Sequence, residues 1–385
     1  MDKVCIRGRD YRDLTAVEIQ AEDGVICRIR PLPQDDTLPI IAPGLVDLQV
    51  NGYAGFDFNR FPIEEQAVLE VTRRLWRQGV TTFLPTVITN SDREIEQMVG
   101  AITGACRRFA AVGASVPGVH LEGPFISPAD GPRGAHDKAF VKAPDWALFQ
   151  RWQQAAEGKI RLLTLSPEWP DAAAFIRRCV QARVIVSLGH TAADADQIAA
   201  AVDAGASMST HLGNGAHLLL PRHPNYIWEQ LAQDSLWCAM IGDGEHLPRS
   251  VLQVFMRVKR DRAFLVSDAT SLAGMPPGRY HLHIGGEVIL SAGGRLSLAN
   301  NPQLLAGSAR SLLYGVNSLV RQGLATRGEA WDMASVRPSA LLGMPTRFGL
   351  AVGAPLNAVA LGEDPRGELT VLAAYQGGAC VWRDE

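Results

Sequence analysis

The chain has 385 residues, of which 47% are hydrophobic, and a formal net charge of −3 from 37 basic and 40 acidic residues mixed along its length. It can therefore bury a large core. The sequence has no basic stripe, so nucleic acid is not an expected partner, and no apolar run of membrane-spanning length, so a membrane is not expected either. Six scattered cysteines without a Cys-x-x-Cys pair, and an N-terminus too polar for a signal peptide, predict a cytoplasmic protein with reduced thiols.

Apolar strand-like runs alternate with amphipathic helix-like segments through most of the chain. The expected strands are 44–50, 80–87, 115–122, 159–167, 183–190, 206–212, 236–244 and 262–270. The segments between them include expected helices at 63–78, 91–110, 171–181, 194–204 and 248–260. Nearly continuous apolar strands are typical of a parallel sheet covered by helices, and eight such units predict a (β/α)8 TIM-like barrel.

The two ends of the chain differ from this pattern. Residues 1–43 and 349–385 contain short β runs separated by turn residues such as glycine and proline. We expect these ends to pair into a small β domain beside a barrel formed by residues 44–348.

Polar side chains gather where the expected barrel strands end, which is where active sites of such barrels are built. Glu122, His190, His211 and Asp268 come from four of these ends. A carboxylate and two imidazoles suit zinc or a similar divalent ion, leaving a position for water, whose pKa the metal lowers. Asp268 could take the proton of that water and return it to a leaving group.

Other residues near the strand ends have simpler explanations. His120 and His217 are interpreted as ordinary histidines with satisfied hydrogen bonds, Asp47 could brace a neighbouring loop, and Asp243 could cap the next turn. The stretch "GNGA" at 213–216 is compatible with a phosphate-binding loop or with a tight turn.

Several stretches resemble the amidohydrolase superfamily and, within it, the N-acetylglucosamine-6-phosphate deacetylase family. They include "APGLVDLQVNGYAG" (42–55), "GVHLEGPFI" (118–126), "GAH" (134–136), "GHTAAD" (189–194), "THLGN" (210–214), "IGDGEH" (241–246) and "LVSDAT" (265–270). These stretches follow the order of the family, and "HLEGPF" is the most specific of them.

The resemblance implies one catalytic metal ion, most plausibly Zn²⁺, held by Glu122, His190 and His211, with Asp268 as general acid and base. Many relatives carry His-x-His after the first strand, where it binds a second metal. Gln49 and Asn51 occupy these positions here and are interpreted as remnants of that second site.

The resemblance also implies the substrate contacts and a homodimer. His136 and His246 correspond to histidines at the sugar, and Asn214 with the backbone of Gly215 lines the sugar-phosphate site. Arg222 corresponds to an arginine that reaches the phosphate bound by the partner subunit. The implied reaction removes the acetyl group from an N-acetyl-hexosamine 6-phosphate, most plausibly N-acetylglucosamine 6-phosphate.

Two departures from the family concern the pocket and the small β domain. Gly213 stands where the family usually has an aromatic residue, which predicts a wider pocket beside the metal, and "GAPLNAVAL" (353–361) replaces the usual pattern near the C-terminus.

The alternative functions are a deacylase of another N-acyl amino sugar or small amide, an isomerase or lyase on the same scaffold, and a metal-free sugar-phosphate binding protein.

Overall fold

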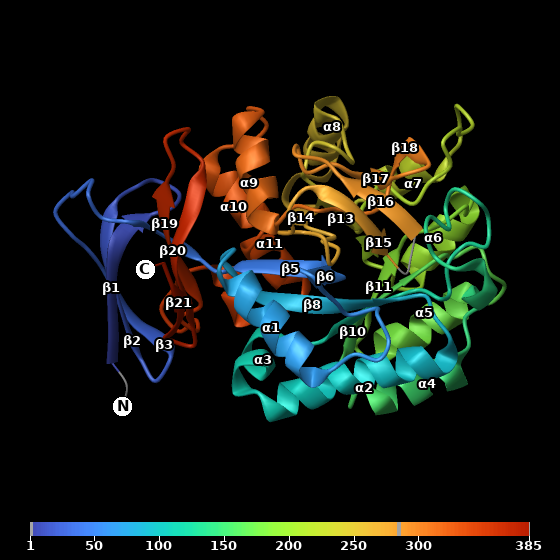
Figure 1. Ribbon diagram of the computed structural model, residues 1–385, viewed down its shortest axis with the longest axis horizontal. Coiled ribbons are helices and arrows are strands. Elements are labelled where there is room, and N and C mark those ends of the chain that lie inside the picture. The colour runs from blue at the N-terminus through green and yellow to red at the C-terminus, as the bar shows by residue number, and fades with distance from the viewer. Residues whose placement is uncertain (1–2, 283–285, 385) are drawn as a thin grey trace.

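The computed structural model describes residues 3–282 and 286–384 (Figure 1). They form an eight-stranded sheet, a seven-stranded sheet, a four-stranded sheet and a two-stranded ribbon. Among these residues, none of the helices has the length and apolar character needed to cross a membrane.

The eight-stranded sheet forms the barrel, and all of its neighbouring strands are parallel. An isolated parallel bridge between Val50 and Ala269 joins the first strand to the end of the last. The strands are β5 (Leu45–Val50), β8 (Val80–Ile88), β9 (Val119–Glu122), β10 (Ile160–Leu165), β11 (Ile185–Leu188), β12 (Met208–Ser209), β13 (Trp237–Ile241) and β14 (Ala263–Val266). The predicted TIM-like barrel is therefore confirmed.

Helices surround the barrel, as the amphipathic segments predicted. They are α1 (Glu65–Trp76), α2 (Asp92–Arg108), α3 (Ala110–Ser115), α4 (Trp146–Ala155), α5 (Ala172–Gln181), α6 (Ala195–Asp203), α7 (Tyr226–Ala232), α8 (Arg249–Lys259), α9 (Leu312–Arg321), α10 (Arg327–Met333) and α11 (Val336–Leu341), with short 3₁₀ turns η1 (Lys138–Phe140), η2 (Arg260–Arg262) and η3 (Pro345–Phe348). Local chemistry sets several boundaries: α6 begins with a capping box in which Asp194 and Gln197 satisfy each other's backbone N–H groups.

The inside of the barrel is filled by a cluster of apolar side chains. Its buried members come from strands, apart from Leu342 after α11. They are Val46, Leu48, Leu84, Leu162, Met208, Ala239, Ile241, Phe264 and Val266. A packed interior of this kind leaves only the ends of the barrel for binding and chemistry.

The two ends of the chain pair in the seven-stranded sheet, as expected. Its order is β21-β20-β19-β4-β1-β2-β3, and the antiparallel pairing of β4 with β19 joins the two ends. The strands are β1 (Lys3–Asp10), β2 (Ala16–Glu22), β3 (Val25–Pro31), β4 (Ile40–Pro43), β19 (Ala358–Glu363), β20 (Leu369–Gln376) and β21 (Ala379–Arg383). Figure 1 shows this sheet beside the barrel, with the blue and red strands next to each other. The domain limits at residues 43 and 349 remain a proposal.

A four-stranded antiparallel sheet between β14 and α9 was not predicted. It consists of β15 (Gly278–Leu282), β16 (Gly286–Leu290), β17 (Leu296–Leu298) and β18 (Asn301–Leu305), and a small ribbon of β6 (Gly52–Tyr53) and β7 (Phe56–Asp57) follows β5. The four-stranded sheet has an apolar cluster of its own around Val288 and Leu296. Arg295 forms an ion pair of 2.9 Å with Glu245, so the sheet is tied to the loop after β13.

Candidate active site

Four residues with reactive side chains lie at the carboxyl end of the barrel. Glu122 is the last residue of β9, while His190, His211 and Asp268 follow the last residues of β11, β12 and β14 by two positions. Since neighbouring strands run parallel, these positions, which span more than 140 residues of sequence, belong to one end of the barrel.

Three of these residues adopt a left-handed backbone conformation that residues other than glycine rarely adopt. The φ angles are 49° at His190, 27° at His211 and 48° at Asp268. Left-handed backbone at a non-glycine residue is costly, and such positions are concentrated at functional sites. This conformation ends the strands earlier than predicted, at Leu188, Ser209 and Val266.

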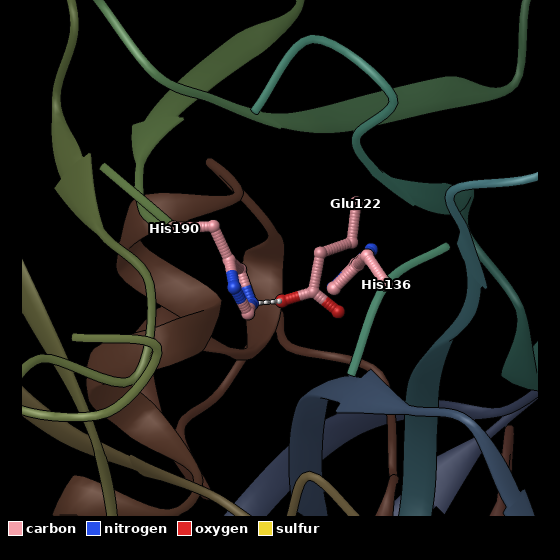
Figure 2. A group of neighbouring side chains, drawn as sticks. All are labelled: Glu122, His136 and His190. Carbon is pink, nitrogen blue, oxygen red and sulfur yellow. Dashed lines mark ion pairs between the residues drawn. The ribbon is translucent and has the colours of Figure 1, made fainter. Parts of the chain in front are cut away.

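Glu122, His190 and His211 bring three polar atoms together. The Oε1 atom of Glu122 lies 3.0 Å from Nε2 of His211 and 3.3 Å from Nε2 of His190. The two Nε2 atoms are 3.1 Å apart. Figure 2 shows Glu122 and His190 directed toward each other, with the ion pair drawn between them.

Glu122 and His190 have hydrogen-bond partners that suit metal ligands. Burial opposes ionisation of Glu122, but its hydrogen bonds with His190 and His211 hold the pKa of the carboxyl well below its usual range. Nδ1 of His190 lies 2.8 Å from the carbonyl oxygen of Pro132, which can only accept a hydrogen bond. Nδ1 of His190 can therefore donate to this carbonyl, and in that tautomer a neutral His190 would offer the lone pair of Nε2 to a cation in place of its hydrogen bond with Glu122.

This donor set fits a divalent cation. Two imidazole nitrogens and one ionised carboxylate from separate strands are the protein ligands of many catalytic zinc sites. The Nδ1 atom of His211 is buried and has no hydrogen-bond partner among the described residues. No contact of Nδ1 therefore determines which of the two ring nitrogens of His211 carries the proton.

His136 lies closer to this cluster than its predicted role as a sugar contact suggested. Ligand atoms of Glu122, His136 and His190 all lie within 4.8 Å of one another, and Figure 2 shows the three side chains grouped together. Nδ1 of His136 lies 2.8 Å from Oγ1 of Thr89, and burial lowers the pKa of His136 to about 3. His136 is thus neutral, and it is a further nitrogen donor beside the ligand set that sequence reasoning did not place there.

Asp268 is a partly buried carboxylate next to the cluster. Burial, and secondly the charge of Glu122, raise the pKa of Asp268 to about 6, while the positive charges of His211 and His246 oppose this shift. Its Oδ1 accepts a hydrogen bond of 2.7 Å from Nδ2 of Asn51. A carboxyl group whose pKa lies near neutrality can both take and return a proton.

Gln49 and Asn51 both contact the carboxylates of the site. Nε2 of Gln49 donates a hydrogen bond of 2.8 Å to Oε1 of Glu122, as Nδ2 of Asn51 does to Asp268. The positions at which many relatives carry metal-binding histidines therefore carry amide donors in this chain.

His246 is oriented by a carboxylate. Its Nδ1 lies 2.7 Å from Oδ2 of Asp243, and both side chains are almost fully buried. Oδ1 of Asp243 accepts hydrogen bonds from the backbone N–H groups of Glu245 and His246. Asp243 thus caps the turn, as one interpretation of the sequence held, and also holds His246, which was not predicted.

In the loop after His211, the backbone of Gly215 lies directly against the ring of His190. Asn214 donates from Nδ2 to the carbonyl oxygen of His211 at 3.3 Å. A Cβ atom at Gly215 would lie 2.7 Å from Nδ1 of His190, and one at Gly213 would lie 3.0 Å from Leu247. Leu247 and Phe255 therefore border the space that a side chain at residue 213 would enter, and the wider pocket beside the metal stays a prediction.

We expect Gly215→Ala to lower metal content and activity together. Its φ of +57° costs a non-glycine residue about 1–2 kcal/mol, and the new methyl group would displace the His190 ring. A displacement of about 1 Å in a catalytic group can reduce the rate about 100-fold. Metal analysis, thermal unfolding and kcat/KM would be measured on the same preparation.

Gly377→Ala is the matched control, because Gly377 has a φ of +55° and a Cβ atom there would meet nothing within 4 Å. It should share the loss of stability and keep both metal and activity. Equal activity losses in the two variants would contradict the expected contact between residue 215 and His190.

Arg222 is not brought to the site by its own chain. It is exposed in the loop between His217 and Asn225, and its guanidinium makes no hydrogen bond or ion pair with the described residues. Leu218 and Leu219 in this loop are 84% and 90% exposed, and Trp228 on α7 is 50% exposed.

The remaining polar residues near the strand ends have local partners. Nε2 of His120 lies 2.8 Å from Oγ1 of Thr164, and Nδ1 of His217 lies 3.0 Å from the hydroxyl of Tyr226. Asp47 accepts a hydrogen bond from the backbone N–H of Ser267 and thereby links β5 to the segment after β14.

Residues 40–381 match the Amidohydrolase family, and the chain belongs to this family. It is accordingly a metal-dependent hydrolase, which agrees with the carboxylate and imidazole cluster of the barrel.

Similar proteins define a narrower group within the family. The chain is 32% identical to an N-acetylgalactosamine-6-phosphate deacetylase of Escherichia coli O157:H7, over 89% of this chain and 90% of that protein. It is 31% identical to an N-acetylglucosamine-6-phosphate deacetylase of Bacillus subtilis, over 86% and 83% of the two chains. An N-acetyl-D-glucosamine-6-phosphate deacetylase structure from Mycobacterium smegmatis superposes with a TM-score of 0.86 at 26% identity, covering 99% of this chain and 100% of that one.

Proposed function

We propose that this hydrolase removes the acetyl group from an N-acetyl-hexosamine 6-phosphate, with N-acetylglucosamine 6-phosphate as its first candidate substrate, and releases acetate and the amino sugar phosphate. The observation that carries the proposal is the cluster of Glu122, His190 and His211 beside Asp268. The similar proteins support the substrate class, since a related M. smegmatis structure contains N-acetyl-D-glucosamine-6-phosphate.

Glu122, His190 and His211 would hold one divalent cation, because Nε2 of His211 lies 3.0 Å from Oε1 of Glu122 and 3.1 Å from Nε2 of His190. Two imidazoles and a carboxylate favour Zn²⁺ as that cation. When bound, the cation supplies Lewis acidity for a carbonyl group and for water. His136, neutral and adjacent to the cluster, would then contact the substrate.

Asp268 would move the proton in two steps. It first takes a proton from the attacking water as the oxygen adds to the acetamide carbon. It then gives that proton to the amide nitrogen as the C–N bond breaks, which leaves acetic acid and the neutral amine. The remaining proton of the acid passes to the amine or to solvent, so the released product is acetate. His246, held by Asp243, and Asn214 with the Gly215 backbone would orient the sugar and its phosphate.

We further propose a homodimer in which Arg222 reaches the phosphate bound by the partner subunit. The exposed leucines of this loop and Trp228 support an interface, because contiguous exposed apolar side chains mark interaction sites. A cytoplasmic location remains a prediction from the free cysteines.

Arg222→Ala tests the substrate and the dimer together. Acetate release would be measured with N-acetylglucosamine 6-phosphate, its galactosamine epimer and both sugars without phosphate. Because a hydrogen bond to a charged group contributes about 1.5–3 kcal/mol, kcat/KM for the phosphorylated sugars should fall about 10- to 100-fold, mainly through KM. The sugars without phosphate should be affected little.

Arg366→Ala, which changes an exposed arginine in the terminal sheet, is the control and should retain full activity. Mixing Arg222→Ala chains with Asp268→Asn chains should restore activity, since each mixed dimer holds one site with both residues intact. An inactive mixture after verified subunit exchange would contradict the shared site. No acetate release from any phosphorylated sugar would contradict the proposed substrate class.

A further inference from the structure

The end of β5 supplies one amide donor to each of the two carboxylates of the site. Gln49 donates to the predicted metal ligand Glu122, and Asn51 donates to Asp268. The register of β5 against β8 shifts between Asp47 and Val50, an irregularity of the kind that redirects side chains near active sites.

Asn51 holds the segment of Asp268 through its backbone as well as its side chain. The backbone N–H groups of Asn51 and Gly52 both donate to the carbonyl oxygen of Ala269, at 2.8 and 3.1 Å. The side chain of Asn51 donates to Oδ1 of Asp268 at 2.7 Å. Ala269 is also bridged to Val50 on one side and Ser308 on the other. Residues 51 and 52 thus hold both the left-handed backbone segment at Asp268 and, through the Asn51 side chain, the carboxylate of Asp268.

We propose that Asn51 is a positioning residue for Asp268 and not merely a remnant of a lost metal site. An amide N–H can only donate, so the Oδ1 atom that receives it is the acceptor in both protonation states of Asp268. The proton moved during catalysis is therefore carried by Oδ2. Asn51 in this way determines which oxygen of Asp268 exchanges the proton and holds the carboxylate in one orientation.

The identity of residue 51 follows from this role. An aspartate of the same shape would place a second negative charge beside Asp268 and could not donate while ionised. An alanine would leave Oδ1 of Asp268 without its donor, and the carboxylate would be free to rotate. Both changes should act on the chemical step and leave substrate binding largely intact.

The test uses a double-mutant cycle and rests on the proposed role of Asp268 as acid and base. We expect Asn51→Ala to lower kcat about 10- to 100-fold, the loss typical of a hydrogen bond to a charged group, with KM and metal content close to those of the wild type. Asn51→Asp should lose at least as much. In the Asp268→Asn background, adding Asn51→Ala should change kcat less than about twofold, because residues that act as one unit are not additive.

Asn317→Ala is the matched control. Asn317 is a buried asparagine of α9 whose side chain exchanges two hydrogen bonds with the backbone of Leu369. Its loss should lower the midpoint of thermal unfolding without coupling to Asp268→Asn.

Each outcome separates the positioning role from its alternatives. The positioning role alone would be overturned if Asn51→Ala lowered kcat by the same factor in the Asp268→Asn background as in the wild type. An unchanged kcat in the single Asn51→Ala variant would overturn it as well. A loss of cooperative unfolding in both Asn51 variants would make Asn51 a structural residue and also overturn it. If Asp268→Asn itself stays within about tenfold of wild-type kcat, the proposed acid and base role fails, and the positioning role fails with it.

Discussion

Asp268→Asn is expected to lower kcat by about two to four orders of magnitude, while the metal content remains that of the wild type. Asparagine keeps the size of the side chain and an oxygen for the hydrogen bond from Asn51. It cannot take a proton from water or return one to the amide nitrogen, and the reaction needs both transfers. The variant would be assayed for acetate release, with the bound metal measured on the same sample.

Asp332→Asn serves as the control for this variant. Asp332 pairs with Arg12 and accepts a hydrogen bond from Tyr11, so its loss should affect stability and leave kcat intact. An Asp268→Asn enzyme within tenfold of wild-type activity would remove Asp268 from the mechanism.

Glu122→Gln is expected to remove most of the bound metal and, with it, most of the activity. The wild type should carry about one divalent ion per chain, because residues 49 and 51 are amides that donate to Glu122 and Asp268 and offer no imidazole nitrogen to a second ion. Glutamine lacks the negative charge that His190 and His211 favour in Glu122. Since loss of an outer partner of a metal ligand already reduces metal affinity or activity about 10- to 100-fold, loss of the ligand charge should exceed that.

Glu18→Gln is the matched control, because Glu18 is a buried glutamate that pairs with Arg7 and Arg30 in the terminal sheet. This variant should be less stable and keep its metal. Two tightly held ions in the wild type would contradict the single-metal site, and an undiminished metal content in Glu122→Gln would exclude Glu122 as a ligand.

His136 shows where the resemblance was least informative about the site. Its position in "GAH" implied a sugar contact, which stays a prediction, and did not indicate that its ring packs against His190 with centroids 4.4 Å apart. The loop that carries His136 also supplies the Pro132 carbonyl to which Nδ1 of His190 can donate. These contacts depend on how the loop after β9 folds back onto β11, and no local pattern in residues 123–136 specifies it.

The sequence alone determined the barrel and the set of strand ends that form the site. Alternation of apolar strands with amphipathic helices depends on local spacing, and parallel pairing brings every carboxyl end to the same end of the barrel. Glu122, His190, His211 and Asp268 could be assembled on that basis before any distance was known.

The tertiary structure decided the contacts that depend on register and loop packing. Gln49 reaches Glu122 across 73 residues of sequence and Asn51 reaches Asp268 across 217, and both contacts form only when the strands are assembled in the barrel. The space beside Gly213 is bordered by Leu247 and Phe255, which come from a different loop and helix. Periodicity reports which face of an element is buried, but only the packed chain determines which side chains meet there.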